Sequence, residues 1–363
     1  MIPYFIANII SLIFIYIGYR FKFNRIALTS VFVFSAIPLI IITSFKYIKI
    51  GTDTESYVHY FDKLYSWSAT LSIIDKQGEA GFWLMNYLGH FISHDYFIIF
   101  LLSSLIITAC YFYSIKVFNL KTLSLFTLLF IGPYYFQLNG TRQAIAIAIF
   151  SISVIFIIKK QPLRYIVSIF IGFLFHKSII ICLPLYFMFK GEIKPRKIAV
   201  IIFIFLIVVV FFQSFINFAS SLDDRYSSYG DQQDSHGGLV VSTFNISLFC
   251  WFILCRVVNI KALANRKFDI LLSLYFLGTL VSLLSILLKI DPSGFLRMSI
   301  YFIQMNIFLL PMTILSFRDH STRYIITFFA VLLMTVYFYL TTNAFSNLTP
   351  YRFNPVIEIS NES

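Results

Sequence analysis

Charge is scarce in this sequence. Only 12% of its 363 residues are Asp, Glu, Lys or Arg, whereas 59% are hydrophobic and the mean hydropathy is +0.84. A soluble domain of this composition lacks the polar residues needed to cover its exterior. Helices of about 20 apolar residues satisfy their own backbone hydrogen bonds in lipid, and apolar runs such as 198–212 do not alternate as the strands of a membrane barrel do. The composition therefore predicts an all-α polytopic membrane protein.

Cysteine is also scarce, and the common cofactor motifs are missing. Cys110, Cys182, Cys250 and Cys255 lie in apolar runs, with no CxxC pair and no neighbouring histidine cluster. We interpret them as small hydrophobic residues rather than as disulfides or metal ligands. The chain has no Walker lysine loop and no GxGxxG, HExxH or GxSxG motif. We therefore expect no nucleotide, no redox cofactor and no metal.

The apolar segments predict about twelve transmembrane or half-spanning helices within one integral membrane domain over residues 1–363. The first apolar run has no basic residue before it, so we expect a retained membrane helix rather than a cleaved signal peptide. Two connections, 46–95 and 217–238, are long and polar. The segments fall near 2–19, 26–45, 96–115, 121–138, 141–158, 163–175, 177–189, 197–216, 239–259, 267–288, 294–316 and 323–343.

The basic residues predict which side of the membrane each connection faces. Lys and Arg collect in alternate short connections, among them 20–25, 159–164 and 190–197, and such clusters mark the cytoplasmic side. The net charge of +12 is therefore a topology signal, and nucleic acid is not an expected partner. The stretch 163–189 agrees with this pattern only if the chain turns back at His176. Both termini and both long connections then lie outside the cytoplasm.

Two arginines on the predicted outer face follow breaks between helices. Arg142 comes after Asn139-Gly140-Thr141, and Arg297 comes after Asp291-Pro292-Ser293-Gly294. A helix N-terminus offers free N–H groups to an anion, and an arginine in the first turn adds a forked donor. Two such sites suit a diphosphate. The alternative is that each arginine only extends its head to the interface.

A histidine and two carboxylates are the candidates for acid–base chemistry. His176 separates two apolar half-spans and has a suitable ordinary pKa for a general base, or else it is a buried histidine bonded to a carbonyl. Asp53 and Tyr57 stand four residues apart on one face of a predicted helix, and Glu79 begins an apolar run. Either carboxylate is a base, a ligand for sugar hydroxyls or a solvated loop charge. Further candidates for substrate binding are Asn139, Gln143, Arg225 and Arg352.

Four short motifs follow one another from Asp53 to Phe353. They resemble motifs of the EpsG-type polysaccharide polymerases, a family that includes Wzy-like O-antigen and exopolysaccharide polymerases. Ala80 stands where proline is usual, which leaves the acid before it intact. The motifs are Asp53-Thr54-Glu55-Ser56-Tyr57 with Glu79-Ala80-Gly81-Phe82 (D-x-x-x-Y … E-P-G-F), Asn139 to Ala146 (N-x-x-R-Q-x-x-A), Phe175-His176-Lys177-Ser178 (F-H-x-S) and Pro350-Tyr351-Arg352-Phe353 (P-Y-R-F).

The resemblance implies a reaction and a location. A growing glycan would pass from undecaprenyl diphosphate to a lipid-linked repeat unit of lipopolysaccharide or exopolysaccharide, at the periplasmic or extracellular face of a bacterial inner membrane. It implies a metal-independent, inverting glycosyltransferase with a GT-C-like bundle. The expected partners are the undecaprenyl-diphosphate-linked oligosaccharide, membrane lipid and a chain-length regulator protein. In this interpretation His176 is the base, Asp53 and Glu79 place the acceptor sugar, and the arginines hold the diphosphate.

Two other functions fit parts of the pattern. A flippase or another transporter predicts internal pseudo-symmetry and charged groups near the midplane on discontinuous helices. Here the charges collect on one face beside two long loops, which favours an enzyme. A ligase that moves finished polymer to another acceptor needs nearly the same residues, so the sequence leaves polymerase and ligase both open.

Overall fold

The computed structural model is almost entirely helical. Within the residues that it describes, the strand-like pairing consists of one antiparallel bridge between Lys46 and Phe353. The described residues are 1–21, 25–189, 195–222, 236–288, 292–344 and 346–355.

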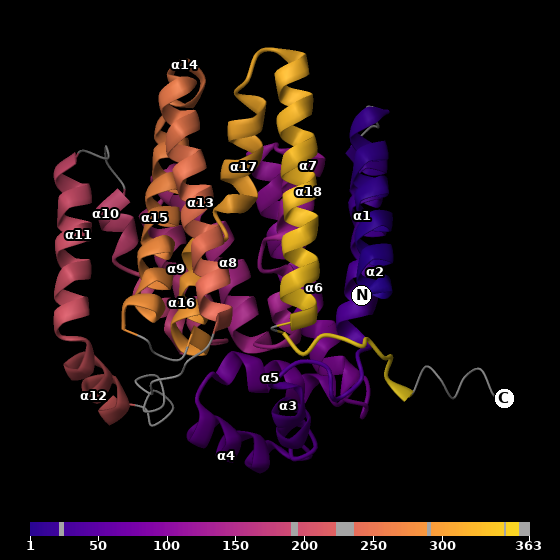
Figure 1. Cartoon of the computed structure of the whole chain (residues 1–363). Coiled ribbons are helices and arrows are strands. Elements are labelled where there is room, and N and C mark those ends of the chain that lie inside the picture. The colour runs from indigo at the N-terminus through magenta and orange to yellow at the C-terminus, as the bar shows by residue number, and fades with distance from the viewer. Residues whose placement is uncertain (22–24, 190–194, 223–235, 289–291, 345, 356–363) are drawn as a thin grey trace. The chain divides into compact units, whose positions relative to one another are not determined.

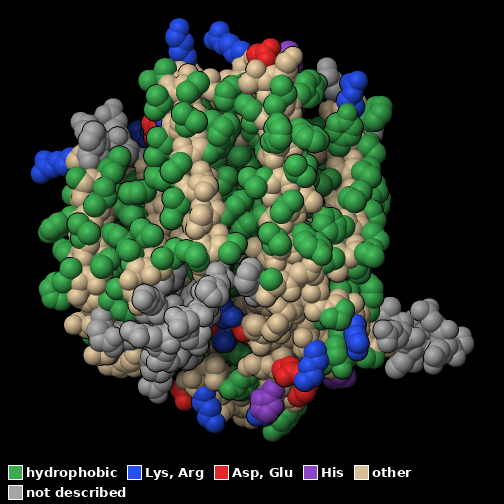
Figure 2. Space-filling model, viewed as in Figure 1, with side chains coloured by type: hydrophobic (Ala, Val, Ile, Leu, Met, Phe, Trp, Pro, Cys, Tyr) green, Lys and Arg blue, Asp and Glu red, His purple; other side chains and the backbone are tan. Residues whose placement is uncertain are grey.

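Six described helices are long and apolar enough to cross a membrane. Their length follows from uninterrupted apolar runs, in which backbone groups can bond only to one another. Hydrophobic side chains cover most of the described surface along the long helices in Figure 2. Leu254 and Val257 of one of these helices are exposed, as are Phe328 and Leu332 of another. The chain is therefore a polytopic membrane protein, as predicted. The six are α1 (Ile2–Arg20), α6 (Phe97–Phe118), α8 (Thr141–Ile158), α13 (His236–Val258), α15 (Arg266–Leu287) and α18 (His320–Ala344).

Shorter apolar helices account for the remaining predicted segments. The pair α16 (Pro292–Ile303) and α17 (Asn306–Leu315) is bent by 42° and can count as a seventh span. The count of twelve, the GT-C-like layout and the single domain stay predictions. Helix α2 (Arg25–Ser44) contributes the apolar stretch Thr29–Ser44. The other helices in apolar runs are α7 (Lys121–Phe130), α9 (Pro162–Phe173), α10 (Leu185–Phe189) and α11 (Pro195–Val210); further short elements are α12 (Phe212–Leu222), α14 (Ile260–Leu263) and two 3-10 helices, η1 (Tyr134–Leu138) and η2 (Lys177–Cys182).

The chain divides into two compact units. Unit 1 comprises 1–183 and 325–363, and unit 2 comprises 184–324. In unit 2, α13 and α15 are joined by the ion pair between Arg256 Nε and Asp269 Oδ1 at 3.1 Å, and the Trp251 indole N–H donates to the Thr313 hydroxyl of α17 at 3.3 Å.

Hydroxyl pairs join the neighbouring helices of unit 1. The helices α1, α2, α6, α8 and α9 pack one against the next, and one pair of small side chains lies between each two successive helices. Small residues allow close approach, and a hydroxyl pair between helices satisfies polar groups that lipid cannot. The pairs are Ser11 and Ser35 at 2.8 Å, Thr43 and Ser104 at 2.6 Å, Ser114 and Ser151 at 2.9 Å, and Ser153 and Ser168 at 2.7 Å.

The chain breaks and doubles back around His176. Helix α9 ends at Phe173 and η2 begins at Lys177. The Tyr165 hydroxyl donates to the carbonyl of Cys182, so the segments before and after the break lie side by side. The break predicted at His176 is confirmed.

The long connection 46–95 folds into three short helices, α3 (Thr54–Phe61), α4 (Trp67–Gln77) and α5 (Ala80–Gly89). They gather at one end of the long helices of unit 1 (Figure 1). The start of α1 also lies at this end, because the Tyr4 hydroxyl donates to the Leu348 carbonyl at 2.9 Å. Segments that the basic residues assign to one side of the membrane therefore lie at one end of unit 1. In the other long connection, residues 223–235 lie outside the described residues.

Candidate active site

Glu79 begins α5, where the backbone turns sharply. Gly78 and Glu79 have φ angles of +66° and +60°. A Cβ atom at Gly78 would lie 2.6 Å from Cε of Lys177, the flexible end of a side chain that can move aside, so it is the backbone angle that favours glycine here. Glu79 has a side chain and still adopts the left-handed conformation, which is uncommon and concentrates at functional sites. The turn directs this carboxylate towards the start of η2.

The glycine that follows Glu79 fixes α5 against the end of α9. The backbone N–H of Gly81 donates to the Leu174 carbonyl at 2.8 Å, and a Cβ atom at Gly81 would lie 2.8 Å from Cβ of Leu174. A larger residue would separate the two segments. The Glu79-Ala80-Gly81-Phe82 motif thus has a structural reason for its glycine, which is to bring Glu79 close to His176.

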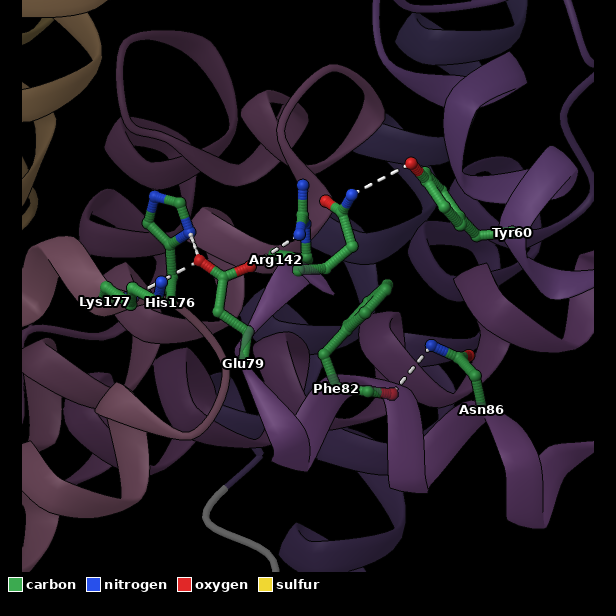
Figure 3. Close-up of polar contacts among 8 residues, drawn as sticks. Tyr60, Glu79, Phe82, Asn86, Arg142, His176 and Lys177 are labelled. Atoms are coloured by element: carbon green, nitrogen blue, oxygen red, sulfur yellow. Dashed lines mark hydrogen bonds and ion pairs between the residues drawn. The ribbon is translucent and has the colours of Figure 1, made fainter. Parts of the chain in front are cut away.

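The Glu79 carboxylate lies between Arg142 and His176 (Figure 3). Oε2 accepts from Nη1 of Arg142 at 2.6 Å, and Oε1 lies 2.7 Å from Nδ1 of His176. The Glu79 side chain is fully buried, whereas those of Arg142 and His176 are 18% and 23% exposed. A buried carboxylate requires such partners, because an unpaired charge is costly away from water. The two partly exposed groups are the ones that can meet a substrate.

His176 is held by its surroundings at one ring nitrogen. It lies in extended backbone just before η2, and the N–H of the next residue, Lys177, donates to Glu79 Oε1 at 3.4 Å. In Figure 3 the second ring nitrogen of His176 points away from Glu79. A carboxylate beside Nδ1 favours the tautomer with a proton there, which leaves Nε2 able to accept a proton.

Arg142 is the second residue of α8, as the motif predicts, and aromatic rings surround it. Its guanidinium carbon lies 5.4 Å from the centre of the Tyr57 ring and 5.6 Å from that of Trp83. Both rings are buried, and cation–π contacts fix the guanidinium in place. Burial raises the pKa of the Tyr57 phenol, while Arg142 opposes that shift. No sequence signal separates Trp83 from an ordinary interfacial tryptophan.

Asp53 and Tyr57 lie on α3 in different surroundings. Asp53 is half-buried just before the helix, and its Oδ1 accepts from the Thr52 hydroxyl at 2.7 Å. Tyr57 is buried against Arg142. The structure thus brings the Tyr57 ring into the site, in contact with the Arg142 guanidinium. The contact of Asp53 or Tyr57 with a sugar stays a prediction.

Lys46 is a buried charged residue near the site that the sequence analysis missed. Its side chain is fully buried, and Nζ donates to the Thr54 hydroxyl at 2.7 Å and to the Leu138 carbonyl at 2.6 Å. Burial lowers the pKa of Lys46 well below its ordinary value, while Asp53 opposes that shift. A lysine directly after an apolar run looks like a side chain that reaches for water, so no sequence signal marks it as buried.

Asn139 and Gln143 lie on either side of Arg142 in the sequence. The Asn139 side-chain oxygen accepts the backbone N–H of Thr52 at 3.1 Å, and Gln143 is buried. At Gly51, a Cβ atom would lie 1.9 Å from the Leu138 carbonyl oxygen. Asn139 thus ties the loop before α3 to the break before α8, and its predicted role in substrate binding stays a prediction.

The remaining predicted arginines are Arg352, Arg297 and Arg225. Arg352 is exposed, and its carbonyl accepts the N–H of Tyr47 at 2.9 Å, which joins the C-terminal motif to the segment after α2. Arg297 is half-buried in α16 of unit 2. Arg225 lies outside the described residues, as does Asp291 of the break before Arg297.

Among the described residues, no group of three or more His, Cys, Asp or Glu side chains is arranged to hold a metal ion. All four cysteines are free thiols, of which three are buried and Cys250 is exposed. The charged side chains of the candidate site are those of Glu79, Arg142 and His176.

Comparison with known proteins identifies one family. The model of the EpsG family matches residues 29–353 of this chain, which include every motif described above. No curated protein and no solved structure matches the chain.

Proposed function

This chain belongs to the EpsG family, and we propose that it transfers a growing glycan from undecaprenyl diphosphate to a lipid-linked repeat unit outside the cytoplasm. Family membership and the apolar helices make it a membrane protein of the polysaccharide polymerase type. The donor, the acceptor, the stereochemistry and the face of the membrane are the parts that we propose.

One observation supports the proposal most. A buried carboxylate, that of Glu79, contacts a histidine and an arginine that are both partly exposed. The histidine is suited to accept a proton, and the guanidinium is suited to bind phosphate oxygens through its forked donors. Attack by a sugar hydroxyl on a glycosyl diphosphate needs these two functions side by side.

The proposed step is a single displacement. The acceptor hydroxyl oxygen attacks the anomeric carbon of the donor as Nε2 of His176 takes the hydroxyl proton. A new glycosidic bond forms, and the bond from the anomeric carbon to the diphosphate oxygen breaks. Undecaprenyl diphosphate leaves with the electron pair, and attack from the opposite side inverts the anomeric centre. The lipid diphosphate is already an activated leaving group, so the proposed step uses neither a nucleotide nor a metal.

Arg142 is proposed to stabilise the departing diphosphate. Negative charge grows on the phosphate oxygens as the bond breaks, and preorganised donors are most effective where charge develops. The contacts with Tyr57 and Trp83 hold the guanidinium ready before the substrate arrives. Glu79 is then a positioning residue, because its buried side chain orients His176 and Arg142. This role differs from the sugar contact predicted for Glu79 from the sequence, which stays an alternative.

The proposed face can be tested by reporter fusions. A reporter placed after Gly191 should be cytoplasmic, because the basic cluster 190–197 predicts that side. A reporter within Ser227–Gly238 should be exported. An exported Gly191 fusion would contradict the predicted topology and with it the extracytoplasmic site.

A transporter is the second candidate, and one observation favours it. The bent pair α16 and α17 fits a broken span or a re-entrant loop, and discontinuous helices form substrate sites in many transporters. However, the buried Glu79 cluster lies at the end of the helices of unit 1, beside α5. That position favours chemistry at the membrane surface.

Deletion of the gene distinguishes the candidates. Loss of a polymerase should leave surface acceptors that each carry a single repeat unit, because export and ligation continue. Loss of a flippase or of a ligase should leave no surface glycan. The measurement is the length distribution of the surface glycan on a gel, with the restored wild-type gene as the control.

A further inference from the structure

Bulky apolar side chains are exposed on α4 and at the end of α5. Two of them, Phe91 and Ile92, are 74% and 71% exposed. Ring contacts of Tyr87 with Trp67, at 5.7 Å, and with Phe91, at 5.4 Å, join the two helices into one surface. We name this surface the α4–α5 apolar face. It consists of Tyr65, Trp67, Leu71, Leu88, Phe91 and Ile92.

The end of α5 lies beside the membrane-spanning part of α6. A Cβ atom at Gly89, the last residue of α5, would lie 3.2 Å from Cδ1 of Leu102 and 3.3 Å from Cγ1 of Ile98. Leu102 is five residues into α6, or roughly 7 Å along its axis at 1.5 Å per residue. The end of α5 therefore lies next to the first turns of a span.

The exposed residues of α4 have two different characters. Trp67 and Leu71 lie one turn apart and belong to the apolar face, whereas Ser68 and Ser72 also lie one turn apart and are exposed and polar. A helix with one apolar and one polar exposed side, and with a tryptophan on the apolar side, is typical of the boundary between lipid headgroups and acyl chains.

We propose that the α4–α5 apolar face lies in the lipid bilayer, at the boundary of headgroups and acyl chains. The occupant of this face is lipid because the face continues directly from the start of a membrane span, where water is excluded. A contiguous apolar surface that is exposed to water promotes aggregation. The proposal goes beyond the glycosyl transfer: it makes α5, whose first turn follows Glu79, an element that the membrane surface itself holds in place.

Spin labels on single cysteines test this placement in proteoliposomes. The background variant is Cys250→Ser, because Cys250 is the exposed native thiol. Phe91→Cys carries the label on the apolar face, with Ile92→Cys as a second variant if the first fails to fold. Ser72→Cys on the polar side of α4 is the matched control, and Leu105→Cys, exposed in the middle of α6, is the lipid reference. The measurement is the collision rate of each label with dissolved oxygen and with a water-soluble nickel chelate.

We expect the order of the two collision rates to differ between the α4–α5 apolar face and the polar side of α4. At Phe91 or Ile92, as at Leu105, oxygen should collide more often than nickel, because oxygen concentrates in lipid and the chelate is excluded. At Ser72 nickel should collide more often. Frequent nickel collisions at Phe91 and Ile92 would place the face in water and overturn the proposal. Low rates for both reagents would mean that a second copy or another protein covers it, which also overturns it. Neither outcome depends on catalysis, so the result stands apart from the proposed reaction.

Discussion

Arg142 and Lys46 are two cations drawn into the same end of unit 1, and the structure treats them differently. The Arg142 guanidinium pairs with the Glu79 carboxylate and keeps 18% of its side chain exposed. The Lys46 ammonium is fully buried, and it donates hydrogen bonds to a neutral hydroxyl and a neutral carbonyl. Both also contact aromatic rings, since Lys46 Nζ lies 4.1 Å from the centre of the Phe100 ring.

The difference separates a group that can act on a substrate from one that holds the fold. A paired, partly exposed cation costs little to bury and can still bind an anion. A fully buried cation that is bonded to neutral oxygens is costly to keep charged. The Lys46 side chain joins segments that are far apart in the sequence, and we infer that this is its role. We therefore expect substitutions around Arg142 to change the reaction rate, and substitutions around Lys46 to change stability.

The largest effect is expected at His176. In His176→Ala the attacking hydroxyl loses its proton acceptor, and a positioned general base contributes about 10²–10⁴-fold to the rate. The measurement is polymer formation in membranes that contain equal amounts of each variant. Asp53→Asn and Glu79→Gln are measured beside it, because each removes a rival base while keeping a similar shape.

The contrary pattern would reassign the base. If His176→Ala forms polymer at a near-normal rate while one carboxylate variant forms none, that carboxylate is the base. If all three variants retain the wild-type rate, the site is not where we propose.

Arg142→Lys should reduce polymerisation by about 10²–10³-fold, as expected for losing a preorganised donor to a developing charge. Lysine keeps the charge but not the forked donor geometry, so it cannot bond Glu79 and phosphate oxygens together. The rate is measured in membranes at equal expression. Lys116→Gln is the matched control, because it removes an exposed cation near the opposite end of α6 and should be nearly silent. Equal loss in both variants would contradict a specific anion site.

Lys46→Met should change how stability depends on pH. Because burial lowers the pKa of Lys46 in the folded protein, the unfolded chain binds more protons in the range between that lowered pKa and 10.5. Wild type should therefore gain stability as the pH rises through this range, and Lys46→Met should lack that gain. The measurement is the unfolding temperature in detergent from neutral to alkaline pH.

One control variant makes the Lys46 result specific. Lys116→Gln should follow the wild-type pH dependence, because that lysine is exposed. A Lys46→Met variant with the same alkaline gain as wild type would mean that Lys46 is not sealed from water.

Asn139→Ala should give the smallest change. It removes the bond from the Thr52 N–H, and a single hydrogen bond contributes about 0.5–1.5 kcal/mol to stability. We expect a slightly lower unfolding temperature in detergent and an unchanged KM for the lipid-linked acceptor. If Asn139 instead binds the substrate, as the motif suggests, KM rises while the unfolding temperature stays the same.

The helical membrane architecture and much of the site could be predicted before the structure. Long apolar runs permit only helices in lipid, and the charge pattern required a break at His176, which the structure has. Glu79, Arg142 and His176 were each singled out by residue type and position. That the three make one cluster was not visible, because it depends on the left-handed turn at Glu79 and on the close approach of Gly81 to Leu174.

Other predicted residues have surroundings that could not be predicted, for similar reasons. Asn139 turns towards the Thr52 backbone, a contact set by how the loop before α3 folds. Tyr57 shares the expected helix with Asp53, yet packing buries it against Arg142. Side-chain direction in such short helices is decided by neighbours from distant parts of the chain.

The sequence by itself determined the membrane class, the break at His176 and the chemical types present at this end of unit 1, because hydropathy and charge act locally on each segment. Only the tertiary structure decided which charges meet. Glu79 lies 63 residues from Arg142 along the chain, and nothing local reports such a pairing. The same holds for Lys46, whose burial depends on the Leu138 carbonyl 92 residues away. A buried charge is stable only where distant groups converge on it, so its position is a property of the folded protein.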